Sequence, residues 1–79
     1  MTSPGIAIPA DEPRLSAREH ECLVWASRGK SSSDIGAILG LSPRTVDSYL
    51  EKACAKLRVR TRVEAVAAAV RDGLIDIDA

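Results

Sequence analysis

The chain has 79 residues, no formal net charge, and only two aromatic side chains, Trp25 and Tyr49. This length allows one small domain without a catalytic cleft between domains, and few aromatics with many alanines favour helices over a β-sandwich. No apolar run of about 18 residues and no signal peptide occurs, so we expect no membrane span and a cytoplasmic protein.

The polar side chains give no indication of an enzyme. Cys22 and Cys54 lie far apart, without a C-x-x-C pair or a Cys/His cluster, so we expect reduced, partly buried thiols and no metal site. The one histidine, His20, has no partner typical of a nucleophilic site. Without a paired acid and base or a phosphate loop, we expect no catalytic residues and no cofactor.

The charges are unevenly distributed along the chain. Residues 14–62 carry ten basic and five acidic side chains, whereas both ends are acidic. Every charged residue from Lys52 to Arg62 is basic. Such a basic segment is typical of contact with nucleic acid, and its alternative is an ordinary solvated face.

Residues 1–14 contain three prolines and a glycine, which predict a flexible arm or linker. Packing of this arm on the domain through Ile6 and Ile8 is the alternative. A first helix is expected after Ser16, which with Glu19 forms a capping box, and it should end at Gly29. Its apolar face comprises Leu15, Cys22, Leu23 and Ala26.

Two further helices are expected on either side of a tight turn. The first is short: it is capped within residues 31–34, carries an apolar face of Ile35, Ile38 and Leu39, and is broken by Gly40. The second is longer and starts at Pro43, after Ser42 as N-cap. Its apolar positions are Val46, Leu50, Ala53, Cys54 and Leu57.

A fourth helix should start after a capping box of Thr61 and Glu64, continue through Val70 and stop at Gly73. It is apolar on nearly every side. If Ala65, Val66 and Ala69 face the core, then Val63, Ala67 and Val70 are left exposed. A two-fold partner would cover them, which predicts a homodimer, and a monomer with exposed alanines is the alternative.

The fold class is therefore all-α, with four helices and a helix-turn-helix at its centre. A string of residues from Leu15 to Val66 makes the prediction more specific. It comprises Leu15-Ser-Ala-Arg18-Glu19, Glu21, Leu23, Gly29, Ile35, Leu39-Gly-Leu-Ser42-Pro-Arg-Thr45-Val46, Lys56-Leu57, Val59, Arg62 and Ala65-Val66. Residues 15–75 thereby closely resemble the LuxR-type, also called GerE- or FixJ-like, DNA-binding domain, and 76–79 remain as an acidic tail.

The resemblance implies a third helix that reads the major groove of DNA and a fourth helix that dimerises. It implies base-facing positions at Asp47, Ser48 and Glu51, and a phosphate contact at Thr45. The full set of implied DNA contacts is Ser42, Arg44, Thr45, Asp47, Ser48, Glu51, Lys52, Lys56, Arg58, Arg60 and Arg62.

The sequence departs from the family at three positions. Many members have lysine where this chain has Asp47, and the family often has asparagine in place of Ser33 and histidine in place of Tyr49. Asp47 and Glu51 could accept hydrogen bonds from cytosine N4. Alternatively, they could pair with Arg44 or Lys52 along the helix and never contact DNA.

The function expected from these observations is sequence-specific binding of double-stranded DNA by a transcriptional regulator, as a dimer on inverted half-sites. The alternative is a protein-interaction module, an anti-activator that pairs with a related regulator through the fourth helix. In that case the carboxylates of Asp47 and Glu51 would weaken its own contact with DNA.

Overall fold

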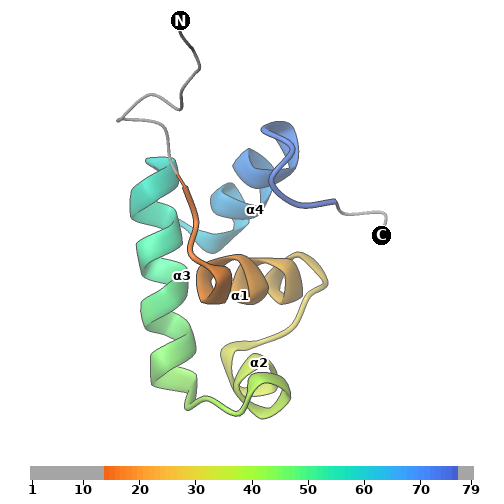
Figure 1. Ribbon diagram of the computed structural model, residues 1–79, viewed down its shortest axis with the longest axis vertical. Coiled ribbons are helices and arrows are strands. Elements are labelled where there is room, and N and C mark those ends of the chain that lie inside the picture. The colour runs from red at the N-terminus through yellow and green to blue at the C-terminus, as the bar shows by residue number, and fades with distance from the viewer. Residues whose placement is uncertain (1–13, 77–79) are drawn as a thin grey trace, which may run out of the picture.

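The computed structural model describes residues 14–76, which form four α-helices and no strand. These are α1 (Ala17–Ser27), α2 (Ser32–Leu39), α3 (Pro43–Leu57) and α4 (Arg62–Arg71). In Figure 1, α3 runs along one side of the molecule while the other three helices lie beside it. The predicted arm, including Ile6 and Ile8, and the predicted tail fall almost wholly outside the described residues.

Local capping sets the helix ends, as the sequence predicts. Capping boxes begin α1 at Ser16, α2 at Ser31 and α4 at Thr61, and Ser42 caps α3 with a proline at its first turn. Gly40 ends α2 in the left-handed conformation with φ 74°. These contacts span three or four residues, so each helix end is fixed by its own short sequence.

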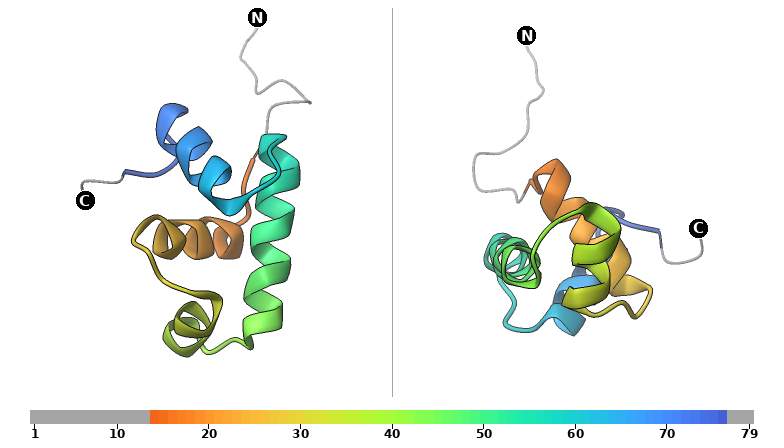
Figure 2. Two further views of the ribbon diagram at one scale, coloured as in Figure 1. Left: turned by 180° about the vertical axis from the view of Figure 1, so that it is seen from behind. Right: turned by 90° about the horizontal axis from the view of Figure 1, so that it is seen from below.

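The core lies where α1 and α3 cross, and α2 and α4 close it from either end (Figure 2). All five predicted apolar positions of α3 are buried, together with Cys22, Leu23 and Ile35. Both cysteines are free thiols in this core. Small alanines of α4, namely Ala65, Ala68 and Ala69, allow that helix to pack closely on α1 and α3.

Two expectations about exposure are wrong. Ile38 was expected on the buried face of α2, yet 46% of its surface is exposed, because only the Ile35 side of this two-turn helix faces α3. Val70 was expected on the open face of α4, but it is half-buried against the core. The segment after α4 turns back at Gly73 and buries Ile75, and both Val70 and Leu74 pack against the core.

A hydrogen bond holds this returning segment on α1. His20 Nε2 donates to the carbonyl oxygen of Leu74 at 2.9 Å, although the two residues are 54 positions apart. His20 therefore has a structural contact that the sequence did not indicate.

Candidate nucleic-acid interface

The outward face of α3 is not covered by the other helices that the structure describes. Val46, Leu50 and Leu57 on one side are buried in the core. The opposite side exposes a continuous stripe at helical spacing, which we call the α3 face: Arg44, Ser48, Glu51, Lys52 and Ala55. Of the predicted base-facing residues, Ser48 and Glu51 belong to this stripe, and Asp47 lies half-buried at its edge.

The turn between α2 and α3 depends on Gly36, a residue that the sequence analysis did not identify. Gly36 is buried in the middle of α2, and a Cβ built on it would lie 2.4 Å from the carbonyl oxygen of Leu41. The Leu41 amide donates to the Gly36 carbonyl at 2.9 Å. A glycine inside an otherwise helical stretch is the signal that could have indicated this close approach.

Two hydroxyl groups form hydrogen bonds at the first turn of α3. Ser42 Oγ accepts from the Thr45 amide at 3.1 Å, and the two hydroxyls share a hydrogen bond of 2.9 Å. Both residues stand at the helix end that the resemblance assigns to phosphate contact, where backbone amides and the helix dipole favour an anion.

Asp47 pairs across the fold and not along its own helix. Its Oδ1 accepts a hydrogen bond from Arg62 Nη2 at 3.1 Å and another from the hydroxyl of Ser32. Arg62 Nη2 also donates to Ser32 Oγ at 3.1 Å. The Ser32 hydrogen bond, followed by the hydrogen bond and charge of Arg62, keeps the pKa of Asp47 below its ordinary value. Of the two alternatives given for Asp47, pairing along the helix with Arg44 or Lys52 does not occur, because its ion-pair partner is Arg62.

Lys56 is also bound within the domain. Its ammonium group donates to Glu19 Oε1 at 2.7 Å and to the Arg14 carbonyl at 3.2 Å. The Glu19 side chain is only 5% exposed, and its Oε1 also accepts from the Ser16 amide. The structure thus gives Lys56 a partner that connects α3 to the start of α1.

The remaining predicted cations are exposed without an ion-pair partner among residues 14–76. They are Arg44, Lys52, Arg58 and Arg60. The Lys52 ammonium lies 5.9 Å from the centre of the Tyr49 ring. Arg58 ends α3 in the left-handed conformation, with φ 61°.

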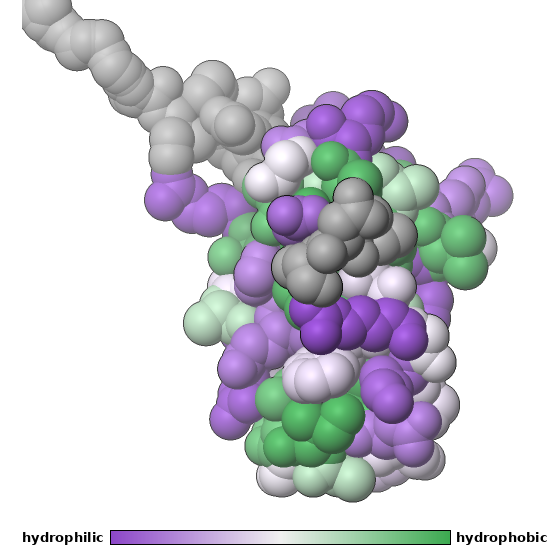
Figure 3. All heavy atoms as spheres, turned by 90° about the vertical axis from the view of Figure 1, so that its right-hand side faces the viewer, coloured by the Kyte–Doolittle hydropathy of each residue, from purple (hydrophilic) through white to green (hydrophobic). Residues whose placement is uncertain are grey.

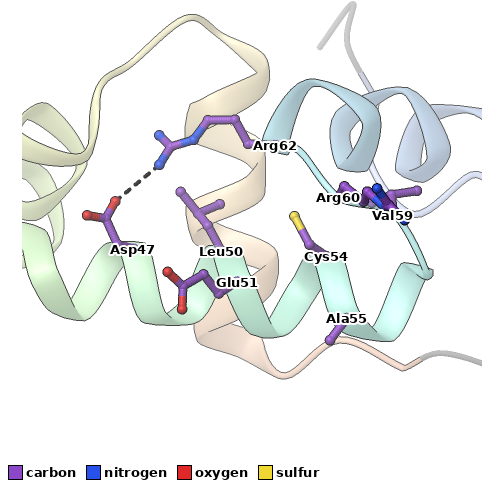
Figure 4. Close-up of a pocket in the computed structure, with 8 residues that line it drawn as sticks. All are labelled: Asp47, Leu50, Glu51, Cys54, Ala55, Val59, Arg60 and Arg62. Carbon is purple, nitrogen blue, oxygen red and sulfur yellow. Dashed lines mark hydrogen bonds and ion pairs between the residues drawn. The ribbon is translucent and has the colours of Figure 1, made fainter.

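A groove of about 490 Å³ separates α3 from the turn that leads into α4 (Figure 4). Asp47 and Glu51 line it from α3, while Arg60 and Arg62 line it from the turn and from α4. Figure 4 shows Asp47 directed toward Arg62, whereas Glu51 lies one turn farther along α3 without a drawn partner. Acidic and basic side chains therefore face one another across the groove.

Among residues 14–76, large hydrophobic side chains are exposed at two places. On α4, Val63 is 75% exposed and Ala67 is exposed, as the sequence predicts, but Val70 is not part of this face. The exposed Ile38 of α2 contributes to the other, and Figure 3 shows apolar surface at the lower end of the molecule, where α2 lies.

Neither a metal site nor a membrane helix is found in the part of the chain that the structure describes. Its His, Cys, Asp and Glu side chains form no group of three that could hold a metal ion. Each of its helices is too short or too polar to cross a bilayer.

Comparison with known proteins places these features in a family. Residues 13–69 match the family described as "Bacterial regulatory proteins, luxR family". The solved structure of the transcription factor GerE superimposes with a TM-score of 0.77 at 31% identity, covering 81% of this chain and 96% of that one.

Individual relatives agree with this match. The transcriptional activator LuxR of Aliivibrio fischeri is 48% identical over 62 residues, which cover 78% of this chain and 25% of the relative. The transcriptional activator BjaR1 of Bradyrhizobium diazoefficiens is 43% identical over 68 residues, covering 86% and 28%. The chain thus spans about a quarter of the length of these relatives. It belongs to the luxR family of bacterial regulatory proteins and carries that family's helix-turn-helix domain.

Proposed function

We propose that the chain binds duplex DNA sequence-specifically, with α3 in the major groove, as the DNA-binding part of a transcription regulator. The observation that carries the proposal is the exposed α3 face on a helix otherwise anchored in the core. A helix of 15 residues is about 22 Å long, and the major groove, about 12 Å wide, admits an α-helix. Such binding to bacterial DNA would take place in the cytoplasm.

The charges around α3 support this orientation. Arg44 and Lys52 lie on the α3 face, and Arg58 and Arg60 follow the end of the helix. Four cations that are not neutralised by the described residues can contact phosphates on both sides of the groove. The hydroxyl groups of Ser42 and Thr45 at the start of α3 can also contact a phosphate.

The test is fluorescence anisotropy of the chain with random duplex DNA at about 50 and 200 mM salt. Four phosphate contacts give a slope of about −4 in log K against log salt, so affinity should fall about a hundredfold for one copy. Two copies on one DNA should lose about ten-thousandfold. A folded protein that does not bind at low salt would instead favour the anti-activator function.

We further propose that two copies associate through α4. Val63 and Ala67 form an apolar face without a partner in residues 14–76, and small side chains allow two helices to approach closely. An interface of one such helix per copy is small, so we expect a weak dimer that forms fully on DNA with two half-sites.

Val63→Asp should give a folded monomer, because a carboxylate in the apolar interface would be desolvated while the exposed site tolerates it in the monomer. Sedimentation equilibrium and binding to a two-site duplex measure the change, with thermal unfolding as the check on folding. Ile38→Asp is the matched control, because it changes the other exposed hydrophobic side chain on α2. Equal masses for the wild type and V63D at high concentration, with equal binding to the duplex, would contradict this interface. Val70→Asp is unsuitable because Val70 packs on the core.

A further inference from the structure

The two carboxylates near the α3 face have unlike surroundings. Asp47 Oδ1 already accepts hydrogen bonds from Arg62 and Ser32. The Glu51 side chain is exposed and has neither an ion pair nor a hydrogen bond with residues 14–76. Of these two carboxylates, only that of Glu51 can therefore bind a ligand without breaking contacts within the domain.

The side chain of Asp47 is directed toward Arg62 and Ser32. Turning its short side chain outward would break a charge-assisted hydrogen bond to Arg62 and a second bond to Ser32. Glu51 has one more methylene group and stands within the exposed stripe between Ser48 and Ala55. Its carboxylate can reach a base edge without a competing partner.

We propose that Glu51 reads a cytosine in the major groove, and that Arg62 and Ser32 are positioning residues that hold Asp47 back from the bases. This inference rests on the proposed DNA binding and names its specificity. A carboxylate accepts from the N4 amino group of cytosine, whereas adenine presents the acceptor N7 beside its amino group and suits an amide side chain.

The same contacts assign a different role to Arg62 from the phosphate contact that the resemblance implies. Its Nη2 is shared between Asp47 and Ser32, at 3.1 Å from each. Arg62 thereby cancels the charge of Asp47 at the edge of a surface that faces phosphates. Arg58 and Arg60, without such partners, remain available to DNA.

The first test is selection of binding sites from a randomised duplex library with the wild type, Glu51→Gln and Asp47→Asn. The wild type should enrich one C·G pair in each half-site. E51Q should shift that position toward adenine by about tenfold, because glutamine offers the donor and acceptor that adenine pairs with. D47N should keep the wild-type preference.

Each other outcome is decisive. If D47N changes the base preference and E51Q does not, Asp47 is the residue that reads the base. If neither variant changes the base preference, neither carboxylate reads a base. Absence of any DNA binding by the wild type would overturn the proposed function itself, which distinguishes that failure from a wrong assignment of the base-reading residue.

The second test is a double-mutant cycle of Arg62→Ala and Asp47→Asn, measured as DNA affinity. R62A should lower affinity about tenfold in the wild-type background, because the Asp47 charge then faces phosphates. In the D47N background, R62A should lower DNA affinity less than twofold. In that same D47N background R62A should leave the salt slope unchanged, which loss of a phosphate contact by Arg62 would not allow.

Arg58→Ala is the matched control, because it removes a cation that has no ion-pair partner among the described residues. It should weaken binding equally in both backgrounds and reduce the salt slope by about one. If R62A unfolds the domain, Ser32→Ala can replace it, because it removes one hydrogen bond to Asp47 without changing a charge. S32A should lower DNA affinity in the wild-type background and leave it unchanged in the D47N background. Equal losses in both backgrounds would identify a phosphate contact and overturn the positioning role.

Discussion

Replacing Gly36 by alanine is expected to remove a large part of the stability of this protein. The new Cβ would lie 2.4 Å from the Leu41 carbonyl oxygen, which is backbone and cannot rotate aside. The turn would have to move away from α2, stretching the hydrogen bond between the Leu41 amide and the Gly36 carbonyl. We expect a loss of about 3 kcal/mol in the free energy of unfolding, a large part of the total for a small domain. Urea denaturation followed by circular dichroism measures it.

Ser33→Ala is the matched control for Gly36→Ala, since Ser33 is exposed in the same helix and a methyl group there meets no backbone. It should change stability by less than about 0.5 kcal/mol. A G36A protein as stable as the wild type would show that α2 and the turn can separate freely, against the close approach described above. If G36A folds with a shifted turn, its DNA affinity should fall, because the turn sets the angle at which α3 leaves the core.

Replacing Lys56 by methionine should destabilise the fold by about 2 kcal/mol, because Glu19 is left ionised and buried without its cation. Lys56 itself is partly exposed, which keeps the loss below that of a fully buried pair. The double variant with Glu19→Gln should recover most of the stability, since glutamine also serves at N3 of a capping box. Thermal unfolding of the three variants measures the effect.

The exposed ion pair of Arg18 with Glu21 is the control for this comparison. Both side chains are more than 40% exposed, and Glu21→Gln should cost less than about 0.5 kcal/mol. If K56M were as mild as E21Q, the Glu19 carboxylate would not depend on Lys56. The same variants also test whether Lys56 contacts DNA, because E19Q/K56M should bind DNA as the wild type does if the lysine serves only to pair with Glu19.

The Glu19 pair also predicts a dependence of stability on pH. Burial raises the pKa of Glu19, but the hydrogen bonds from Lys56 and Ser16 and the Lys56 charge outweigh it, so the pKa lies below the ordinary 4.5. The stabilisation is therefore complete above pH 4.5 and is lost as the pH falls through the lowered value. Denaturation curves between neutral pH and pH 3 should show a smaller loss in E19Q than in the wild type. Parallel curves would contradict this contribution.

The helices and their ends could be predicted from the sequence because their determinants are local. The pairs Ser16 with Glu19 and Thr61 with Glu64 are three residues apart, and the proline after Ser42 fixes the start of α3. The spacing of apolar residues likewise indicated the buried side of α3, and thereby which of its side chains remain exposed for a ligand. Family resemblance added the expectation of DNA binding to these exposed positions.

Only the tertiary structure decided which charges on this surface are available. Lys56 meets Glu19 across 37 positions of the chain and Asp47 meets Arg62 across 15, so both pairs depend on how the helices cross. The need for glycine at position 36 likewise arises from the distance between α2 and its following turn, and not from α2 alone. Periodicity shows which face of a helix is buried, but the partner of a charged side chain is set by packing between helices that are distant in sequence.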